Sequence, residues 1–195
     1  MKRQLSSRRR VHAFSLIELM VVIGIMVVLA GLLISALPGI QSRVNRQKVE
    51  ALLAEIEGGL SKYEVDHGIY PQNRMESGNR DGVGVEGASV LYKHLSGDYD
   101  EDGAVDFEQN EKVYIPKLAY EENEDARAPR SLFIGGEYMV IDSYGDPLRY
   151  IADPPNIPQD ERQTMNPTYD LWSIAGADPT DPEEQAKHIT NWQAN

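Results

Sequence analysis

Regularly spaced acidic side chains form the clearest candidate for chemistry in the middle of this 195-residue chain. They alternate with other residues, a glycine follows the third, and a fourth comes after an apolar residue. Carboxylate oxygens at alternate positions can wrap one Ca²⁺ ion, and the glycine permits the sharp turn that such a loop needs. The sequence therefore predicts a calcium loop, whose candidate ligands are Asp98, Asp100, Asp102, Asp106 and the backbone carbonyl of Ala104.

The last ligand position of this loop departs from the usual pattern. An EF-hand loop ends on a bidentate glutamate, whereas this chain offers Gln109 there, so that Glu108 or Glu111 would have to close the site. Residues 98–125 carry eleven acidic side chains against Lys112 and Lys117. Without a cation these carboxylates repel one another, and a solvated acidic loop is the alternative interpretation.

A second notable carboxylate, Glu18, begins a long apolar segment. Nineteen residues without a charge follow it, from Leu19 to Leu37. As a helix they extend about 28 Å, close to the hydrocarbon thickness of a bilayer. Five basic side chains and no acidic one precede the segment within residues 1–13. The positive-inside rule keeps that end in the cytoplasm and sends the acidic remainder across the membrane, into the periplasm of a bacterium.

A cleaved secretory signal is the alternative for this N-terminal segment, because such signals also begin with basic and then apolar residues. The apolar run is longer than the usual 7 to 15 residues, and Ile34-Ser35-Ala36 is a poor cleavage site. A plain membrane anchor leaves Glu18 unexplained, since a carboxylate there costs about 2 to 3 kcal/mol on insertion and is normally retained with a partner.

The junction between the two parts of this segment carries a family resemblance. Arg10-Val11-His12-Ala13 followed by Phe14-Ser-Leu-Ile-Glu18-Leu-Met-Val-Val-Ile-Gly24 resembles the class III signal of type IV pilins and pseudopilins. The resemblance implies that a prepilin peptidase cleaves between Ala13 and Phe14, that Phe14 is then N-methylated, and that the helix is retained as anchor and filament core. Ala13 stands where the family usually has glycine.

Glu18 occupies the fifth position after the implied cut, where the family carries its glutamate. Cleavage creates a buried ammonium group at Phe14, which requires a carboxylate, and Glu18 of a neighbouring subunit can supply it within a filament. The alternative is a carboxylate that extends toward the lipid headgroups of the cytoplasmic side.

Three further blocks resemble the major pseudopilin of type II secretion systems, in the order in which that group has them. With the signal they cover roughly residues 10–71 and 137–192. The blocks are Tyr63-Glu-Val-Asp-His-Gly-Ile-Tyr70-Pro71, Asp142-Ser-Tyr144-Gly145-Asp146-Pro147-Leu-Arg-Tyr150, and Tyr169-Asp-Leu-Trp-Ser173 continuing to Asp178 and Trp192.

The resemblance also implies a calcium site in the C-terminal loop. Asp178 matches its first carboxylate and the carbonyl of Ala175 is placed to join it, while Asp181 lies nearer than the family pattern has it. Glu183 or Glu184 are substitutes. His188 stands where an aspartate is usual, and imidazole is a poor calcium ligand.

These candidate sites need a scaffold, which the apolar pattern supplies. Val49, Leu52, Leu53, Ile56, Leu60 and Tyr63 recur at helical spacing. Pro38-Gly39 is expected to bend or loosen the helix before this stripe, and Gly68 with Pro71 to end it. Strands are predicted over 137–142, 148–152 and 169–174, with a turn at 143–147. The fold class is α+β, a type IV pilin-like fold in which the long helix covers one small antiparallel sheet.

The expected organisation follows the chain in five segments. They are a cytoplasmic leader (1–13), a transmembrane and filament-core helix (14–37), the amphipathic half of the long helix (38–71), an acidic insertion or loop region (72–136), and a sheet with a C-terminal loop (137–195). The chain would be a single-pass protein of the bacterial inner membrane.

The sequence favours a structural protein over an enzyme. It has no cysteine, which excludes disulfides and thiolate chemistry, and its net charge of −12 disfavours nucleic-acid binding. His12, His67, His94 and His188 lack metal-ligand spacing, and no nucleophile or phosphate-loop motif occurs. The alternatives are a type IV pilin for adhesion, motility or DNA uptake and, from another class, a periplasmic enzyme with paired carboxylates such as a glycosidase.

The partners follow from the resemblance. It implies copies of the same chain in a helical filament, minor pseudopilins, the prepilin peptidase, an inner-membrane assembly platform and membrane lipid. Ca²⁺ is the expected cofactor.

Overall fold

The computed structural model describes five stretches of the chain. The chain divides into two compact units, Met1–Ser42 and Arg43–Asn195. The stretches are residues 15–74, 86–106, 112–123, 129–178 and 181–192, and the backbone alone is described for residues 35–39.

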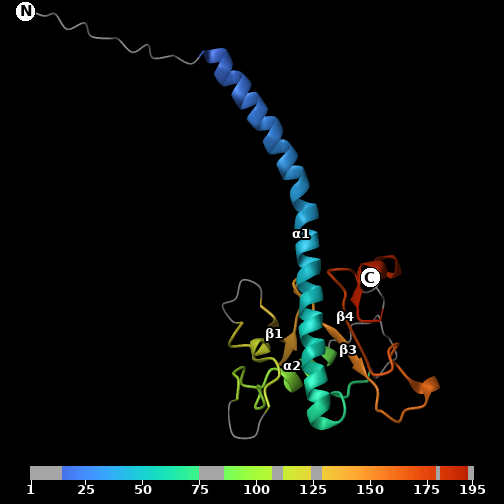
Figure 1. Ribbon diagram of the computed structural model, residues 1–195. Helices are drawn as coiled ribbons and strands as arrows, with labels where there is room; N and C mark the ends of the chain where they lie inside the picture. Colours follow the sequence, from blue (N-terminus) through green and yellow to red (C-terminus); the bar gives the residue numbers. More distant parts are fainter. Residues whose placement is uncertain (1–14, 75–85, 107–111, 124–128, 179–180, 193–195) are drawn as a thin grey trace, which may run out of the picture. The chain divides into compact units, whose positions relative to one another are not determined.

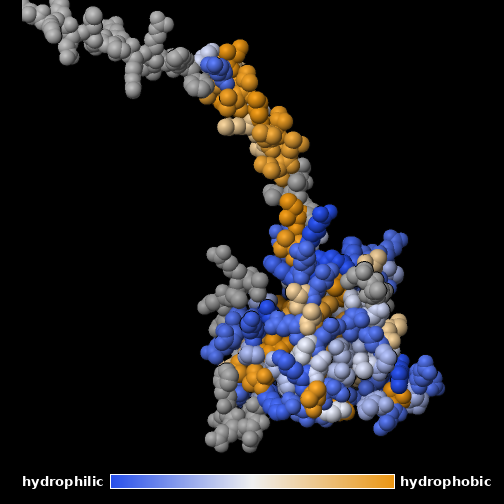
Figure 2. Space-filling model, in the orientation of Figure 1, coloured by the Kyte–Doolittle hydropathy of each residue, from blue (hydrophilic) through white to orange (hydrophobic). Residues whose placement is uncertain are grey.

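Helix α1, Leu16–His67, is by far the longest element (Figure 1). Its first part, Leu16–Ile34, is long and apolar enough to cross a membrane, and its surface is almost wholly hydrophobic (Figure 2). None of these nineteen residues is buried within the chain. The helix is continuous through Pro38 and Gly39, so the predicted loosening does not interrupt it there.

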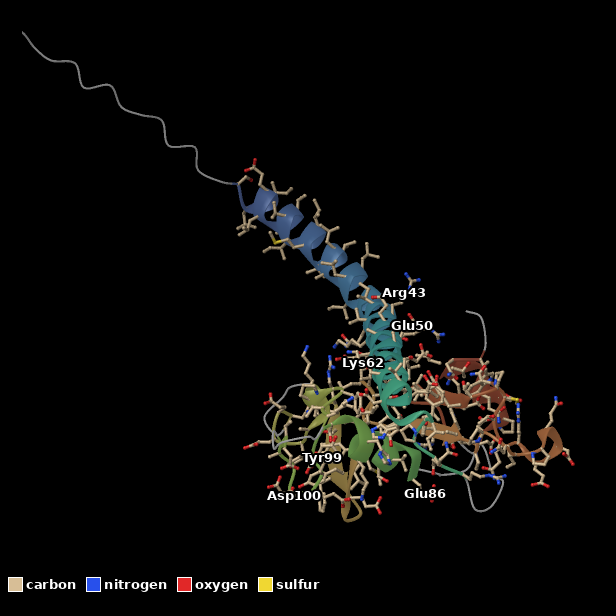
Figure 3. All side chains as sticks on the ribbon, turned by 60° about the horizontal axis from the view of Figure 1, so that its bottom comes forward. Arg43, Glu50, Lys62, Glu86, Tyr99 and Asp100 are labelled. Carbon is tan, nitrogen blue, oxygen red and sulfur yellow. The ribbon has the colours of Figure 1, made fainter. Side chains whose placement is uncertain are left out.

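The second part of α1 carries the predicted stripe into the core. Charged side chains such as Arg43, Glu50 and Lys62 occur along this part (Figure 3). Each Leu or Ile that is fully removed from water contributes roughly 1.5–3 kcal/mol to folding. Five apolar side chains of the stripe are buried: Val49, Leu52, Leu53, Ile56 and Leu60. Tyr63 is partly buried and packs against this group.

The end of α1 is set by local backbone chemistry, as the sequence predicts. The last helical residue is His67, whose ring stacks on Tyr63 with centroids 4.1 Å apart. Gly68 then adopts a φ of +77°, and its N–H donates to the carbonyl of Glu64 at 2.7 Å. A left-handed glycine that satisfies a terminal carbonyl is a common helix stop, because glycine has no Cβ to oppose it.

The strands form two sheets, and the predicted single three-stranded sheet is wrong. β1 (Ser131–Ile134) pairs antiparallel with β2 (Glu137–Val140), while β3 (Arg149–Ala152), β4 (Tyr169–Ser173) and β5 (Ile189–Thr190) form a second antiparallel sheet in that order. Between β2 and β3 there is a single bridge, Ile141 to Pro147. Two hydrogen bonds flank this bridge, from the Asp142 N–H to the Asp146 carbonyl at 2.9 Å and from the Leu148 N–H to the Val140 carbonyl at 3.0 Å, and beyond it β3 pairs with β4.

The segment 72–136, expected as an acidic loop region, contributes much of the core. It holds α2 (Glu86–Leu95), whose Leu91, Tyr92 and Leu95 are buried, and the short 3₁₀ helix η1 (Pro116–Leu118). α2 lies directly on β3, because Gly87 approaches the Tyr150 backbone so closely that a Cβ would lie 2.4 Å from its carbonyl oxygen. Two further 3₁₀ helices are η2 (Gln159–Glu161) and η3 (Pro182–Lys187).

Candidate functional site

Asp98 begins the predicted calcium loop directly after α2, and its side chain is fully buried. Its Oδ2 accepts hydrogen bonds from the Tyr92 hydroxyl at 2.7 Å and from the Gly103 N–H at 2.9 Å, while Oδ1 accepts from the Asp102 N–H at 3.0 Å. These bonds fold the chain back over the carboxylate. Gly103 has a φ of +100°, so the glycine serves the sharp turn that the motif predicts.

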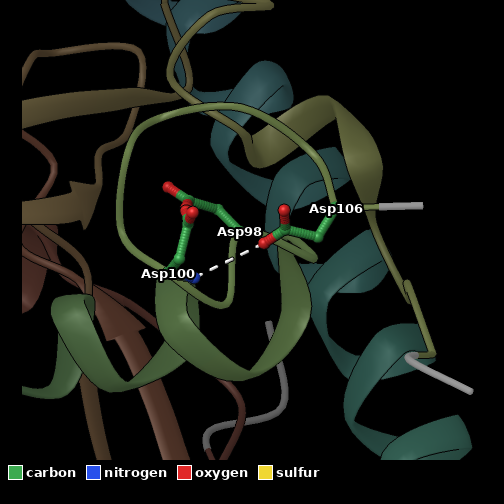
Figure 4. Close-up of side chains that lie close together, drawn as sticks. All are labelled: Asp98, Asp100 and Asp106. Atoms are coloured by element: carbon green, nitrogen blue, oxygen red, sulfur yellow. Dashed lines mark hydrogen bonds between the residues drawn. The ribbon is translucent and has the colours of Figure 1, made fainter. Parts of the chain in front are cut away.

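Asp106 closes the loop from the other side. Its carboxylate accepts from the N–H groups of Tyr99 at 2.8 Å and Asp100 at 3.4 Å, and its own N–H donates to the carbonyl of Gly97 at 2.8 Å. Asp98, Asp100 and Asp106 thereby each offer an oxygen within 4.8 Å of the others (Figure 4). Three carboxylates at such separations repel one another, and a bound divalent cation would remove that repulsion.

The remaining predicted residues of this loop are placed differently. The Asp102 carboxylate caps the turn by accepting from the Ala104 N–H at 2.9 Å, and Asp102 does not belong to the close group of three. Figure 3 places Asp100 beside Tyr99, which is 37% exposed. Gln109 and its predicted substitutes Glu108 and Glu111 lie outside the described residues.

Aromatic side chains tie this loop to the core. The Tyr92 hydroxyl accepts from the Tyr120 N–H at 3.0 Å while donating to Asp98. Burial, followed by the hydrogen bond to Asp98, raises the pKa of Tyr92 far above its usual value. Tyr138 of β2 stacks on Tyr92, and its hydroxyl donates to the Asp102 carbonyl at 3.3 Å. Local sequence patterns do not predict these contacts, because α2 and β2 lie far from each other along the chain.

The C-terminal loop places its predicted ligands in two groups. The Asp178 N–H donates to the Glu184 carboxylate at 2.9 Å, and Glu184 also accepts from Lys187, whose hydrogen bond lowers the pKa of that carboxyl. Asp181 instead caps η3, accepting from the Glu183 N–H at 2.9 Å. Residues 179–180 lie outside the described chain.

The turn before β3 contains a buried carboxylate for which the sequence assigned no role. Asp142 is 2% exposed, and its Oδ1 accepts from the N–H groups of Tyr144 at 2.8 Å and Asp146 at 3.1 Å. Its Oδ2 accepts from the Ser173 hydroxyl of β4. Burial raises the pKa of Asp142, and these hydrogen bonds act in the opposite direction. The turn motif at 142–147 was the only signal for this site.

The N-terminal candidates are described in part. Ala13 and Phe14 lie outside the described residues. Glu18 is exposed in the first turn of α1, and its Oε2 accepts from the Ser15 N–H at 2.8 Å. The carboxylate is thus turned toward the start of the helix, where a negative charge is favourable.

A groove of about 680 Å³ lies beside the last turn of α1, between Val65 and the segment 112–114. It contains one carboxylate, Asp66, which accepts hydrogen bonds from Lys112 and from the Tyr114 hydroxyl. The Lys112 bond is the main reason that the pKa of Asp66 is lowered. A glycosidase needs two facing carboxylates, and among the described residues that line this groove Asp66 is the only one.

Comparison with known proteins identifies the N-terminal segment. Residues 8–34 match the model of the prokaryotic N-terminal methylation motif. Type II secretion system core protein G of Klebsiella pneumoniae is 43% identical over 63 residues, which are 32% of this chain and 45% of that protein. The protein of the same name from Pectobacterium carotovorum is 39% identical over 66 residues, 34% of this chain and 42% of the relative.

A third relative of that name, from Dickeya chrysanthemi, is 36% identical over 70 residues, 36% of this chain and 46% of the relative. The chain thus spans about half the length of the curated relatives it matches. No solved structure matches the chain. The chain thus carries a prokaryotic N-terminal methylation motif at the start of an apolar helix, and over about a third of its length it is similar to core protein G of type II secretion systems.

Proposed function

We propose that this chain is a structural subunit, a pseudopilin, of a type II secretion filament that helps to export folded proteins. The observation that carries the proposal is the methylation motif at residues 8–34, followed by an apolar helix and a folded domain and joined to the similarity with core protein G. The role is structural rather than enzymatic. The subunit is held in the inner membrane by α1, with its folded domain in the periplasm.

The exposed apolar surface of Leu16–Ile34 supports assembly as well as anchoring. A helix that buries none of this surface within its own chain must be covered by lipid or by other helices. Cleavage between Ala13 and Phe14 leaves the helix intact, so that copies of it can pack together as a filament core. Glu18 then neutralises the N-terminal ammonium of a neighbouring subunit.

The proposed partners follow from this assembly. The prepilin peptidase processes the chain, an inner-membrane platform adds it to the filament, and minor pseudopilins join the same filament. The chain itself is the repeating unit, and membrane lipid surrounds α1 before assembly.

A secretion assay tests the proposed function. Cells that lack their own copy of this chain should fail to release a folded secreted protein into the medium, and the full chain should restore release. Restored surface pili, twitching or DNA uptake without restored secretion would contradict the proposal and assign the chain to the type IV pilin alternative.

We further propose that the Asp98 loop binds Ca²⁺. The spacing of its carboxylates and the closeness of Asp98, Asp100 and Asp106 support this site, and hard oxygen ligands suit the ion. Among the described residues, Asp178 and Asp181 do not belong to a close group of three carboxylates, although the resemblance places a calcium site there together with the carbonyl of Ala175. The C-terminal loop is therefore the alternative site.

A further inference from the structure

The turn between β2 and β3 contacts three separate parts of the folded domain. The Asp142 carboxylate accepts from two N–H groups of its own turn and from the Ser173 hydroxyl at the end of β4. The next residue, Ser143, donates its hydroxyl to the carbonyl of Asn45 in α1 at 2.9 Å. The turn therefore links α1 to the end of the second sheet.

The third contact is with the start of the C-terminal loop, residues 174–178. The Ser173 hydroxyl, which donates to Asp142, accepts from the Ala175 N–H at 2.9 Å. The Tyr144 ring lies against Gly176, where a Cβ would be 3.0 Å from its Cδ1 atom. The Asp142 carboxylate is thus connected to the loop through the Ser173 hydroxyl. The Tyr144 ring of the same turn packs against the loop at Gly176.

The backbone of this loop needs such support. Ala175 has a φ of +54° and Gly176 a φ of +73°. A non-glycine residue at positive φ is strained, and such a conformation persists only where its surroundings hold it in place. The hydrogen bond to the Ala175 N–H is the contact that acts directly on the strained residue.

The buried charge of Asp142 is satisfied by hydrogen bonds rather than by a contacting cation. The nearby Arg149 guanidinium donates to the Pro147 carbonyl at 2.6 Å. Burying a carboxylate without an ion pair is costly unless donors surround it, and here the turn supplies two N–H donors and β4 supplies the Ser173 hydroxyl. Because burying the Asp142 carboxylate costs free energy, we expect its role to be to favour one conformation of the turn and of the segments that it contacts.

We propose that the turn 142–146 is a clamp that sets the C-terminal loop, residues 174–178, against β4 and α1, with Asp142 as its positioning residue. The clamp fixes the direction in which the chain leaves β4 toward Asp178 and η3. Its contacts lie within one subunit, so the clamp does not require filament assembly.

Hydrogen exchange of the full chain in detergent micelles tests the clamp, followed by mass spectrometry of a peptide that covers residues 174–178. Asp142→Ala should raise exchange in this peptide about tenfold, because Ser173 loses its acceptor and the turn loses its shape. Asp142→Asn should restore most of the protection, since the amide oxygen accepts from the two N–H groups and the amide nitrogen donates to Ser173. The amides of β3 and β4 should keep their protection in both variants.

Two further variants make the test decisive. Asp146→Ala removes a carboxylate of the same turn that makes no hydrogen bond with the described residues, and it should leave exchange at 174–178 unchanged. Ser173→Ala removes a single hydroxyl and should raise exchange at Ala175 even where Asp142→Ala unfolds the chain. Unchanged exchange at 174–178 in Ser173→Ala, or equal loss of protection in Asp142→Asn and Asp142→Ala, would overturn the clamp.

Discussion

At the scale of single residues, the role of each carboxylate depends on how many hydrogen-bond donors surround it. Asp98 and Asp142 are buried and accept three hydrogen bonds each. Asp100 is exposed and lies within reach of two other carboxylates. Buried carboxylates with several donors hold the chain in shape, whereas the exposed Asp100 carboxylate accepts one hydrogen bond, from the Asp102 N–H at 3.2 Å, and is more accessible to a cation.

The calcium proposal predicts a metal-dependent gain in stability. The full chain in detergent should melt at a higher temperature with millimolar calcium than with chelator, and calcium at a hundred times its dissociation constant contributes about 2.7 kcal/mol. Asp100→Ala should remove most of this shift, because it deletes an exposed ligand oxygen and leaves the hydrogen bonds of the buried Asp98 carboxylate in place. Differential scanning fluorimetry measures the shift.

Controls separate the two candidate loops. Asp160→Ala changes an exposed acidic residue of η2 and should keep the full calcium effect. Loss of the effect in Asp178→Ala, with Asp100→Ala unaffected, would move the site to the C-terminal loop. No calcium shift in the unmutated chain would leave residues 98–106 as a solvated acidic loop.

Glu18 is predicted to act in assembly rather than in folding. Glu18→Ala should insert in the membrane and keep the folded domain, while filaments fail or become sparse, because the buried N-terminal ammonium then lacks its carboxylate. Electron microscopy and a shear assay measure filament yield. Normal filaments from this variant would favour a carboxylate that merely extends toward the headgroups.

Asp66 is predicted to make stability depend on pH at the end of α1. Its pKa is lowered in the fold, mainly by the Lys112 hydrogen bond, so its contribution is present above the unfolded value of about 3.9 and is lost as pH falls through the folded value. Asp66→Asn should therefore destabilise the chain at pH 7 and have little effect near pH 2. Thermal unfolding across this range measures the difference, and an equal effect at both pH values would contradict it.

At the scale of elements, two adjacent glycines of α1 have opposite roles. A Cβ on Gly59 would lie 2.7 Å from Cδ1 of Ile115, whereas a Cβ on Gly58 meets nothing within 4 Å. Helix propensity alone makes both glycines weak points in the helix and does not distinguish them. The tertiary contact shows that Gly59 lets the segment after the acidic loop pack closely on α1.

This difference predicts opposite effects of one substitution. Gly58→Ala should stabilise the chain by about 0.5–1 kcal/mol, because alanine restricts the unfolded chain and favours helix. Gly59→Ala should destabilise it by about 1–3 kcal/mol through overpacking against Ile115. Chemical unfolding of both variants in detergent provides matched measurements, and equal effects would show that Ile115 moves aside freely.

At the scale of the whole molecule, processing is the first event that the proposed function requires. In cells that have a prepilin peptidase, the mature chain should begin with methylated Phe14, because the leader 1–13 is removed while the apolar helix remains. Intact-mass analysis of the membrane fraction measures this. A mature chain that begins after Ala36 would indicate an ordinary secretory signal.

Replacing Ala13 gives the matched control for processing. Ala13→Gly restores the residue usual before the cut and should be cleaved at least as completely as the natural chain. Ala13→Leu should stay uncleaved, since a large side chain prevents close approach to the peptidase. Unprocessed chain should remain in the inner membrane and form no filaments.

The sequence by itself determined the features that depend on neighbours along the chain. The signal before Phe14, the apolar helix expected over 14–37, the buried stripe of α1 and its glycine stop follow from local spacing. The structure agrees with the last three, and the apolar part long enough to cross a membrane is Leu16–Ile34. Helix periodicity and hydropathy depend on residues a few positions apart, so both can be recognised in the amino-acid sequence. The alternating carboxylates of the Asp98 loop are readable for the same reason.

Only the tertiary structure decided which distant segments meet. It divided the strands between two sheets, placed α2 on β3 at Gly87 and joined Asp142 to Ser173. It also brought Asp98, Asp100 and Asp106 together while turning Asp102 to its own backbone. Strand partners, buried donors and close backbone approaches depend on the packing of segments far apart in the chain, and no local spacing records which of the competing pairings buries the most apolar surface.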